Sequence, residues 1–216
     1  GTAWRALEER ADGSFFQGWT WTGCLAEERF SDPVVLEARV AGQVVALALF
    51  NRRLDRLGRE WLYLGESGDP ALDCPYIEHN GVLVARGQPA DLGARCIAAA
   101  RRLPLDNRRP WAFAAPFFSR FHRALIARGL ERGEIGLWQM SYGERKVGYL
   151  YNFHYRDTVL TYQSGFATFD GGSALKPGYT AHALVIRHCI EDGLARYDFL
   201  AGDARYKRSL GDTSYM

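Results

Sequence analysis

The chain has 216 residues, which is enough for one large domain or two small ones. Hydrophobic residues make up 47% of it and the formal net charge is only +2, so it can build a core and its charge requires neither nucleic acid nor a membrane as a partner. The scattered cysteines form no CxxC pair and lie at no ligand spacing from a histidine, so no metal site is expected. No apolar run approaches the roughly 18 residues of a membrane span. The first ten residues do not read as a signal peptide, and the cytoplasm is the expected compartment.

The first hundred residues predict helices around a small antiparallel sheet. Helices are expected over residues 3–10, 19–30 and 91–102, the last with Leu92, Cys96 and Ala99 facing inward. Apolar runs predict strands over residues 33–40, 43–50, 61–64 and 81–85, and Ala41-Gly42 suits a two-residue hairpin. The aromatic residues between positions 15 and 21 can form a ligand platform, but core anchors are the favoured interpretation.

A polar segment at residues 65–80 interrupts this pattern of apolar strands. It brings carboxylates and a histidine into one loop-rich stretch, among them Glu66, Glu78 and His79. One interpretation is a surface loop in which Asp69-Pro70 starts a turn. The other is the rim of a binding site for a polyol or an amine.

The second half predicts a hairpin followed by a strand, a helix and a further strand. A helix over residues 116–129 precedes expected strands at 137–141, 146–154 and 158–166. Thr180 can cap a helix whose apolar residues fall at helical spacing and which ends at Gly193, and a short strand follows at 197–200. The apolar residues of this helix are Ala181, Leu184, Val185 and Cys189. A helix between two strands of one sheet predicts a crossover connection.

The loop that precedes this last helix is rich in glycine and carries Lys176 before Pro177-Gly178. Backbone N–H groups at a helix N-terminus can hold a phosphate. The spacing matches neither GxGxxG nor GxxxxGK[ST], so the dinucleotide and P-loop motifs are excluded. On these residues alone, an anion site and an ordinary tight connection both remain open.

Several phrases in the chain resemble one known family. They are YIEHNG from Tyr76, GYLYNF from Gly148, YQSGF from Tyr162, KPG from Lys176 and YDFLAGDARYKRSLG from Tyr197. In this order they resemble CelD-like/FemAB-like acyltransferases of the GNAT (Gcn5-related N-acetyltransferase) superfamily. The resemblance covers most of the chain. It implies an α/β (α+β) fold with a mixed, mostly antiparallel sheet flanked by helices, and two GNAT-like halves over residues 1–105 and 106–216 as remains of a tandem arrangement.

The activity that this resemblance implies is acyl transfer from acetyl-CoA or another acyl-CoA. The implied acceptor is an amine or hydroxyl of a sugar, a polysaccharide or a cell-envelope precursor, with no DNA as partner. Residues 176–180 depart from the Gln/Arg-x-x-Gly-x-Gly/Ala loop of many GNAT enzymes, which keeps two alternatives open. One is a non-catalytic module in exopolysaccharide or cellulose biosynthesis, and the other is a FemAB-type transferase that uses aminoacyl-tRNA.

The resemblance also assigns roles to individual residues. Tyr206 is expected to protonate the leaving thiolate, Asp203 to accept a proton from the acceptor, and His182 to contribute from the first turn of its helix. The residues expected to hold the donor are Gln163, Ser164, Lys176, Gly178, Tyr179, Thr180 and Lys207. Glu66, Glu78 and His79 are expected to bind the acceptor. Without the resemblance, a core or surface histidine and a solvated basic turn at residues 205–208 would be the simpler interpretations.

A final expectation concerns residues 103–110. The chain up to about Leu103 resembles the first half of the family, whereas residues 109–125 resemble a segment that lies much later in its members. We therefore expect a middle stretch to be missing near this junction. A step between consecutive Cα atoms larger than about 3.8 Å would reveal such a gap.

Overall fold

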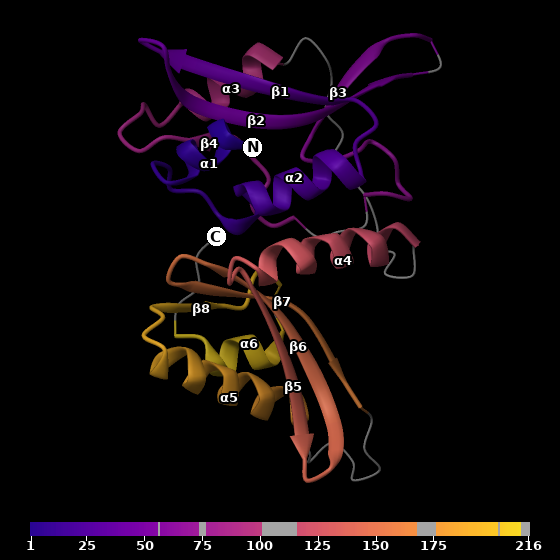
Figure 1. Ribbon diagram of the computed structural model, residues 1–216, viewed down its shortest axis with the longest axis vertical. Coiled ribbons are helices and arrows are strands. Elements are labelled where there is room, and N and C mark those ends of the chain that lie inside the picture. The colour runs from indigo at the N-terminus through magenta and orange to yellow at the C-terminus, as the bar shows by residue number, and fades with distance from the viewer. Residues whose placement is uncertain (56, 74–76, 101–115, 168–175, 203, 213–216) are drawn as a thin grey trace. The chain divides into compact units, whose positions relative to one another are not determined.

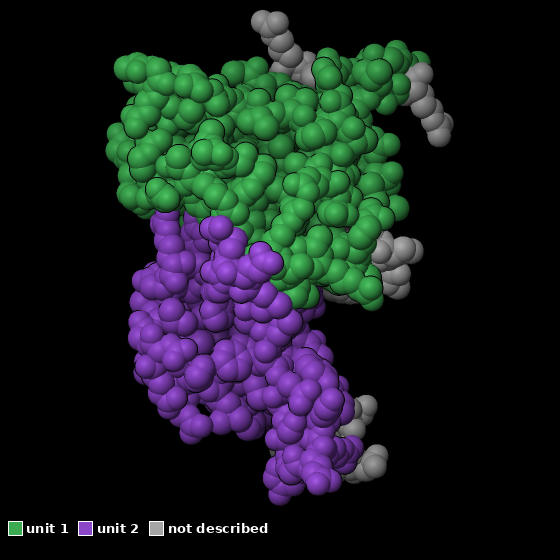
Figure 2. All heavy atoms as spheres, viewed as in Figure 1, with its two compact units in different colours: residues 1–128 green, residues 129–216 purple. Residues whose placement is uncertain are grey.

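The computed structural model describes the chain except for residues 56, 74–76, 101–115, 168–175, 203 and 213–216 (Figure 1). The chain divides into two compact units, Gly1–Arg128 and Gly129–Met216 (Figure 2). The predicted division into GNAT-like halves at residues 105 and 106 stays a prediction. Most of helix α4 (Pro116–Leu130) belongs to the first unit, where its Phe121 ring packs edge-on against Trp21 with the centroids 5.2 Å apart. The expected junction near residues 103–110 lies outside the described residues.

The first unit combines helices with an antiparallel sheet (Figure 1). Strand β2 pairs with β1 and β3 on its two sides and, near its beginning, with the short strand β4. The elements before α4 are α1 (Thr2–Glu8), the 3-10 helix η1 (Phe15–Gln17), α2 (Trp19–Glu28), β1 (Pro33–Val40), β2 (Gln43–Leu54), β3 (Glu60–Leu64), β4 (Leu83–Val84) and α3 (Leu92–Ala100). The predicted hairpin at Ala41-Gly42 is confirmed, with φ of 47° and 80°.

The core of the first unit gathers around strand β2 and the early aromatic residues. Residues 45–50 of β2 are all buried, which is typical of a central strand covered on both faces. Phe16 packs edge-on against Trp21 with centroids 4.9 Å apart, and both rings are buried. The interpretation of these aromatic residues as core anchors is therefore confirmed. In α3 Cys96 is buried as predicted, but Ala99 is exposed, so the prediction for Ala99 is wrong.

The second unit is a four-stranded sheet in the order β5-β6-β7-β8. The first three strands are antiparallel neighbours, whereas β8 runs parallel to β7. The elements are β5 (Ile135–Tyr142), β6 (Arg145–Tyr155), β7 (Thr158–Phe166), α5 (Pro177–Glu191), β8 (Arg196–Asp198) and α6 (Arg205–Leu210). The predicted crossover is confirmed, because α5 connects the two parallel strands. A mixed α/β fold with mostly antiparallel sheets is likewise confirmed.

Helix α5 begins one turn earlier than predicted. Lys176 is its N-cap and Pro177 its first residue, so Thr180 lies inside the helix and the prediction of a Thr180 cap is wrong. Proline suits this position because its fixed φ is already helical and its missing N–H would have had no partner there. At the other end the helix stops at Glu191, and Gly193 adopts a φ of 77° as expected for a C-terminal glycine.

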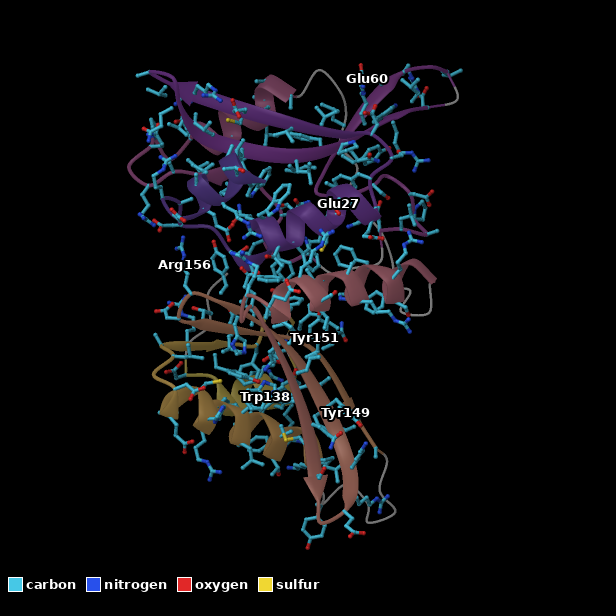
Figure 3. All side chains as sticks on the ribbon, viewed as in Figure 1. Glu27, Glu60, Trp138, Tyr149, Tyr151 and Arg156 are labelled. Atoms are coloured by element: carbon cyan, nitrogen blue, oxygen red, sulfur yellow. The ribbon has the colours of Figure 1, made fainter. Side chains whose placement is uncertain are left out.

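Helix α5 covers one face of the second sheet. The buried residues of this core are Leu150, Val159, Ala181, Val185 and Cys189. Trp138 lies on the same face, its ring 5.0 Å from that of His188 in α5, whereas Tyr149 and Tyr151 lie on the other face (Figure 3). Leu184, which the helical spacing places in the core, is 43% exposed, so that prediction is wrong.

Candidate functional site

Strands β7 and β8 separate shortly after they begin. Their pairing covers only Thr158 to Leu160 on β7. Directly afterwards β7 has a bulge, because Asn152 and Tyr151 of β6 face Thr161 and Gln163 and leave Tyr162 as the extra residue. From the bulge to Phe166, β7 therefore has a strand neighbour on one side only among the described residues. A free strand edge offers backbone N–H and C=O groups to a ligand.

The free end of β7 lies against the first turn of α5. A Cβ atom added to Gly178 would lie 3.1 Å from Cε2 of Phe166, the last residue of β7. The same ring also covers Gly148 of β6, where an added Cβ would lie 2.2 Å from its Cδ1. Phe166 thus joins the end of β7 to the start of α5, and both glycines leave room for its ring.

The N-terminus of α5 has the character of an anion site. Its first turn contains no acidic side chain, and the exposed Lys176 precedes it. The N–H groups of Gly178 and Tyr179 belong to the first helical turn, which has no intrahelical acceptors, whereas Thr180 donates to the carbonyl of Lys176 at 3.2 Å. The sequence predicts Gly178, Tyr179 and Thr180 for donor phosphate, but the backbone N–H of Thr180 already has a partner in the helix. The preceding loop, residues 168–175, is not described.

Gln163 and Ser164 occupy the free-edge segment of β7. Ser164 pairs in register with Leu150, so it lies on the face of the sheet that α5 covers, and it is exposed there. Gln163 lies on the opposite face and is half-buried. The structure therefore brings Ser164, but not the side chain of Gln163, to the face that carries α5.

Lys207 makes contacts that the sequence does not predict. Its ammonium donates to the backbone carbonyls of Leu200, at 3.1 Å, and of Ala201. Leu200 has a φ of 57°, a conformation that is unfavourable for a branched side chain and needs support from its surroundings. Lys207 thus holds the turn after β8. Its expected role toward donor phosphate stays a prediction.

A cluster of aromatic rings surrounds His182 between α5, β8 and α6. The ring of Tyr206 stacks on His182 with a centroid distance of 5.2 Å and an interplanar angle of 6°. Phe199 meets His182 edge-on at 5.4 Å, and the Tyr197 hydroxyl lies 3.1 Å from Nδ1 of His182. His182 is 2% exposed and Tyr206 is half-buried. Two of the three residues predicted as catalytic, Tyr206 and His182, are therefore in direct contact.

Burial controls the protonation of this cluster. It lowers the pKa of His182 to about 4, with a further contribution from the positive charge of Lys207, so the imidazole is neutral at physiological pH. Burial raises the pKa of Tyr206, which keeps its hydroxyl protonated. The arrangement places a protonated phenol next to a neutral imidazole, and the protonated phenol is the form that can donate a proton.

A row of polar side chains continues from His182 across the sheet, through the half-buried Tyr197 to the buried Thr161 and Asn152. Burial raises the pKa of Tyr197 to about 12, although the nearby side chains of Thr161 and Asn152 act to lower this pKa. These two side chains lie within reach of its hydroxyl, although neither is aligned as a full hydrogen bond. Asn152 is completely buried. The row thus runs Asn152, Thr161, Tyr197, His182 and ends beside Tyr206.

The sequence analysis missed Tyr197, Thr161 and Asn152. A usable signal was present in the strand pattern. Asn152 lies two residues after the core residue Leu150, and Thr161 lies two residues after the core residue Val159, so each polar side chain lies on the core-facing side of its strand. A polar residue at a core position needs a buried partner. That signal indicates a buried polar cluster, although it does not identify the partner.

The residues predicted for the acceptor lie in the first unit. Glu66 and Glu78 are half-buried, and the exposed His79 has its ring 6.4 Å from that of Phe16. A small hollow beside them is lined by their neighbours and by aromatic and aliphatic side chains, but not by Glu66, Glu78 or His79. Its lining residues are Trp4, Phe16, Trp21, Thr22, Leu25, Leu49, Leu64, Gly65, Ile77, Asn80 and Gly81. The acceptor assignment stays a prediction.

The same segment contains a buried ion pair. The guanidinium of Arg29 contacts the carboxylate of Asp73, and their side chains are 1% and 2% exposed. The Asp73 carboxylate also accepts hydrogen bonds from the N–H of Ser67 at 2.7 Å and from its hydroxyl at 2.8 Å. Asp73 therefore stabilises the loop after β3 through buried contacts, and its side chain is too little exposed to bind a ligand.

Three further expectations concern the proton acceptor Asp203, a metal site and a membrane span. Asp203, predicted to accept the acceptor's proton, lies outside the described residues. Within the described part of the chain, no group of three or more His, Cys, Asp or Glu side chains could hold a metal ion. None of the helices described has the length and apolarity that a membrane span requires.

Comparison with known proteins identifies the family. The model of the acetyltransferase (GNAT) domain matches residues 77–208, well over half of the chain. The chain belongs to the GNAT acetyltransferase family. No curated protein and no solved structure matches it. The GNAT match includes both Tyr206 and the start of α5, and it reaches back to β4 in the first unit.

Membership of the GNAT family makes acyl transfer the general activity of this fold, with acyl-CoA as co-substrate. The α5 N-terminus fits such a donor, because it combines N–H groups that have no intrahelical acceptor, an adjacent cation and no acidic residue in the first turn. The finer CelD-like/FemAB-like assignment stays a prediction.

Proposed function

We propose that this GNAT protein transfers an acyl group from acetyl-CoA or another acyl-CoA to an amine or hydroxyl of a sugar, polysaccharide or cell-envelope precursor. The observation that carries the proposal is the contact between Tyr206 and His182. His182 belongs to the second turn of α5, whose first turn adjoins the free end of β7. The proposed proton donor and the proposed anion site thus belong to the same unit, as does the strand edge of β7.

The proposed reaction needs no covalent enzyme intermediate. The acceptor nitrogen or oxygen attacks the thioester carbonyl, a bond forms from that atom to the acyl carbon, and the carbon–sulfur bond breaks. Tyr206 donates its phenolic proton to the departing sulfur, which suits a hydroxyl that burial keeps protonated. The acceptor loses one proton, for which Asp203 is the proposed base. Tyr206 regains its proton from solvent.

Donor phosphate is proposed to bind at the N-terminus of α5. The N–H groups of Gly178 and Tyr179 supply hydrogen bonds, and Lys176 supplies a positive charge at the same helix end. Ser164 lies on the sheet face that α5 covers and is proposed to contact the donor as well. Glu66, Glu78 and His79 of the first unit are proposed to bind the acceptor.

Lys176→Ala is expected to raise the donor KM by up to about fivefold, since an exposed charge contributes up to about 1 kcal/mol. The side chain is exposed and makes no capping hydrogen bond, so thermal stability and kcat should change little. Lys146→Ala is the matched control, because Lys146 is exposed in the β5–β6 hairpin. Thiol-release kinetics at varied acetyl-CoA provide the measurement. Equal donor KM values for the two variants would remove Lys176 from the donor site.

The proposed function as a whole is tested first by donor binding and then by turnover. Calorimetric titration with acetyl-CoA should show saturable binding that Lys176→Ala weakens. Thiol release should then increase when an amino sugar or a neutral oligosaccharide is added. Binding without turnover on any amine or hydroxyl would favour the non-catalytic module. Absence of binding by every acyl-CoA would overturn donor specificity, and aminoacyl-tRNA would be the next donor to test.

A further inference from the structure

The environment of the Tyr197 hydroxyl indicates in which direction its proton points. Nδ1 of His182, at 3.1 Å, is the aligned partner, while Thr161 and Asn152 approach the same oxygen from the sheet. A phenol oxygen has one proton to give and two lone pairs to share. The hydroxyl of Thr161 and the amide of Asn152 lie near those lone pairs but form no aligned hydrogen bond with them. Among the described residues, Nδ1 of His182 is therefore the one aligned partner for the phenolic proton.

The neutral state of His182 is consistent with this direction. A neutral imidazole carries one N–H, and a hydrogen bond accepted at Nδ1 places that N–H at Nε2. Among the residues that the structure describes, the ionisable groups that face the ring are Tyr197 of β8 and Tyr206 and Lys207 of α6. None of them is a carboxylate that would favour an imidazolium. The geometry thus favours an imidazole held in one tautomer and one orientation.

We propose that Tyr197 is a positioning residue whose hydroxyl donates to Nδ1 of His182 and thereby holds the imidazole flat against the ring of Tyr206. The interplanar angle of 6° between His182 and Tyr206 is the feature that this contact maintains. His182 then acts by orienting Tyr206 rather than as a base, because its Nδ1 lone pair is occupied. The contact between Tyr197 and His182 is independent of the proposed function, and only its role in catalysis rests on that function.

The tautomer can be measured without a substrate. Nitrogen-15 spectra of the histidine side chains, with His182 assigned by its loss in His182→Phe, should show Nε2 protonated and Nδ1 as acceptor in the wild type. Tyr197→Phe keeps the ring and removes the donor. Because that donor stabilises the neutral form, its loss should raise the pKa of His182 above about 4, by up to about one pH unit.

The matched control is Tyr142→Phe, since Tyr142 is 84% exposed at the end of β5. This control should leave the tautomer and the pKa of His182 unchanged. A wild-type imidazole protonated at Nδ1, or an unchanged pKa in Tyr197→Phe, would overturn the proposal. The first of these results does not depend on Tyr197→Phe, so it holds even if that variant fails to fold.

Turnover separates a positioning role from a merely structural one. Tyr197→Phe should lower kcat about tenfold and leave the donor KM unchanged, and adding His182→Phe should cause little further loss, because both act through one contact. Independent, multiplicative losses would refute the shared role. If the wild type turns over no acyl donor, the proposed function fails, and the imidazole spectra alone decide whether Tyr197 holds His182.

Discussion

Tyr206→Phe is expected to lower kcat by about 100-fold or more and to leave the donor KM within about twofold of wild type. The phenylalanine keeps the ring that stacks on His182, so the variant removes the proton and little of the packing. The departing thiolate then leaves unprotonated, which raises the barrier of the chemical step alone. Single-turnover thiol release at saturating acetyl-CoA measures this step, and Tyr142→Phe serves as the exposed control.

A change of leaving group sharpens this test. An acyl donor whose leaving group is a stronger acid needs less help from a proton donor. The ratio of wild-type to Tyr206→Phe rates should therefore shrink when an activated aryl thioester replaces acetyl-CoA. A ratio that stays the same with both donors would mean that Tyr206 does not protonate the leaving group and has another role. Near-wild-type turnover of acetyl-CoA by Tyr206→Phe would mean that the Tyr206 hydroxyl takes no part in the chemical step.

Local sequence patterns predicted the elements of the second unit well. The apolar strands and the stop at Gly193 each depend on neighbouring residues, and both are confirmed. The start of α5 was missed because two local signals competed. Thr180 is a good N-cap by residue type, but Pro177 can occupy only the first helical turn, and it prevailed.

The candidate site was less predictable than the fold that carries it. Tyr206 and His182 are 24 positions apart, and their contact forms only after β8 and α6 have folded against α5. The partners of His182 lie on β8, directly after it and on α6, and no short motif encodes how these segments pack against α5. Sequence reasoning therefore proposed the two residues separately and could not show that one stacks on the other.

In residues 65–80 the sequence likewise could not show which side chains are buried. A row of carboxylates in a loop reads equally as a ligand rim or as a solvated surface. Asp73 is neither, because Arg29, which lies 44 positions earlier, neutralises it in the interior of the first unit. Only the tertiary structure shows that this carboxylate belongs to the support of the loop rather than to its surface.

Asp73→Ala is expected to lower the free energy of unfolding of the first unit by about 3–5 kcal/mol, since removing one partner leaves a buried charge uncompensated. The Arg29 side chain is 1% exposed, so its guanidinium would stay buried without the carboxylate. Ser67 loses the acceptor of both its N–H and its hydroxyl in the same step. Urea unfolding followed by tryptophan fluorescence measures the change.

Two further variants decide whether the buried charge is the cause. Asp12→Ala removes the partner of Arg86 in a pair that is exposed by 73% and 51%, and it should cost less than about 1 kcal/mol. Adding Arg29→Met to Asp73→Ala removes the stranded guanidinium and should recover part of the lost stability, because an apolar side chain of similar length carries no desolvation penalty. A loss in Asp73→Ala no larger than that in Asp12→Ala would show that solvent reaches Arg29, and the residue 65–80 segment would then be open enough for its carboxylates to meet an acceptor directly.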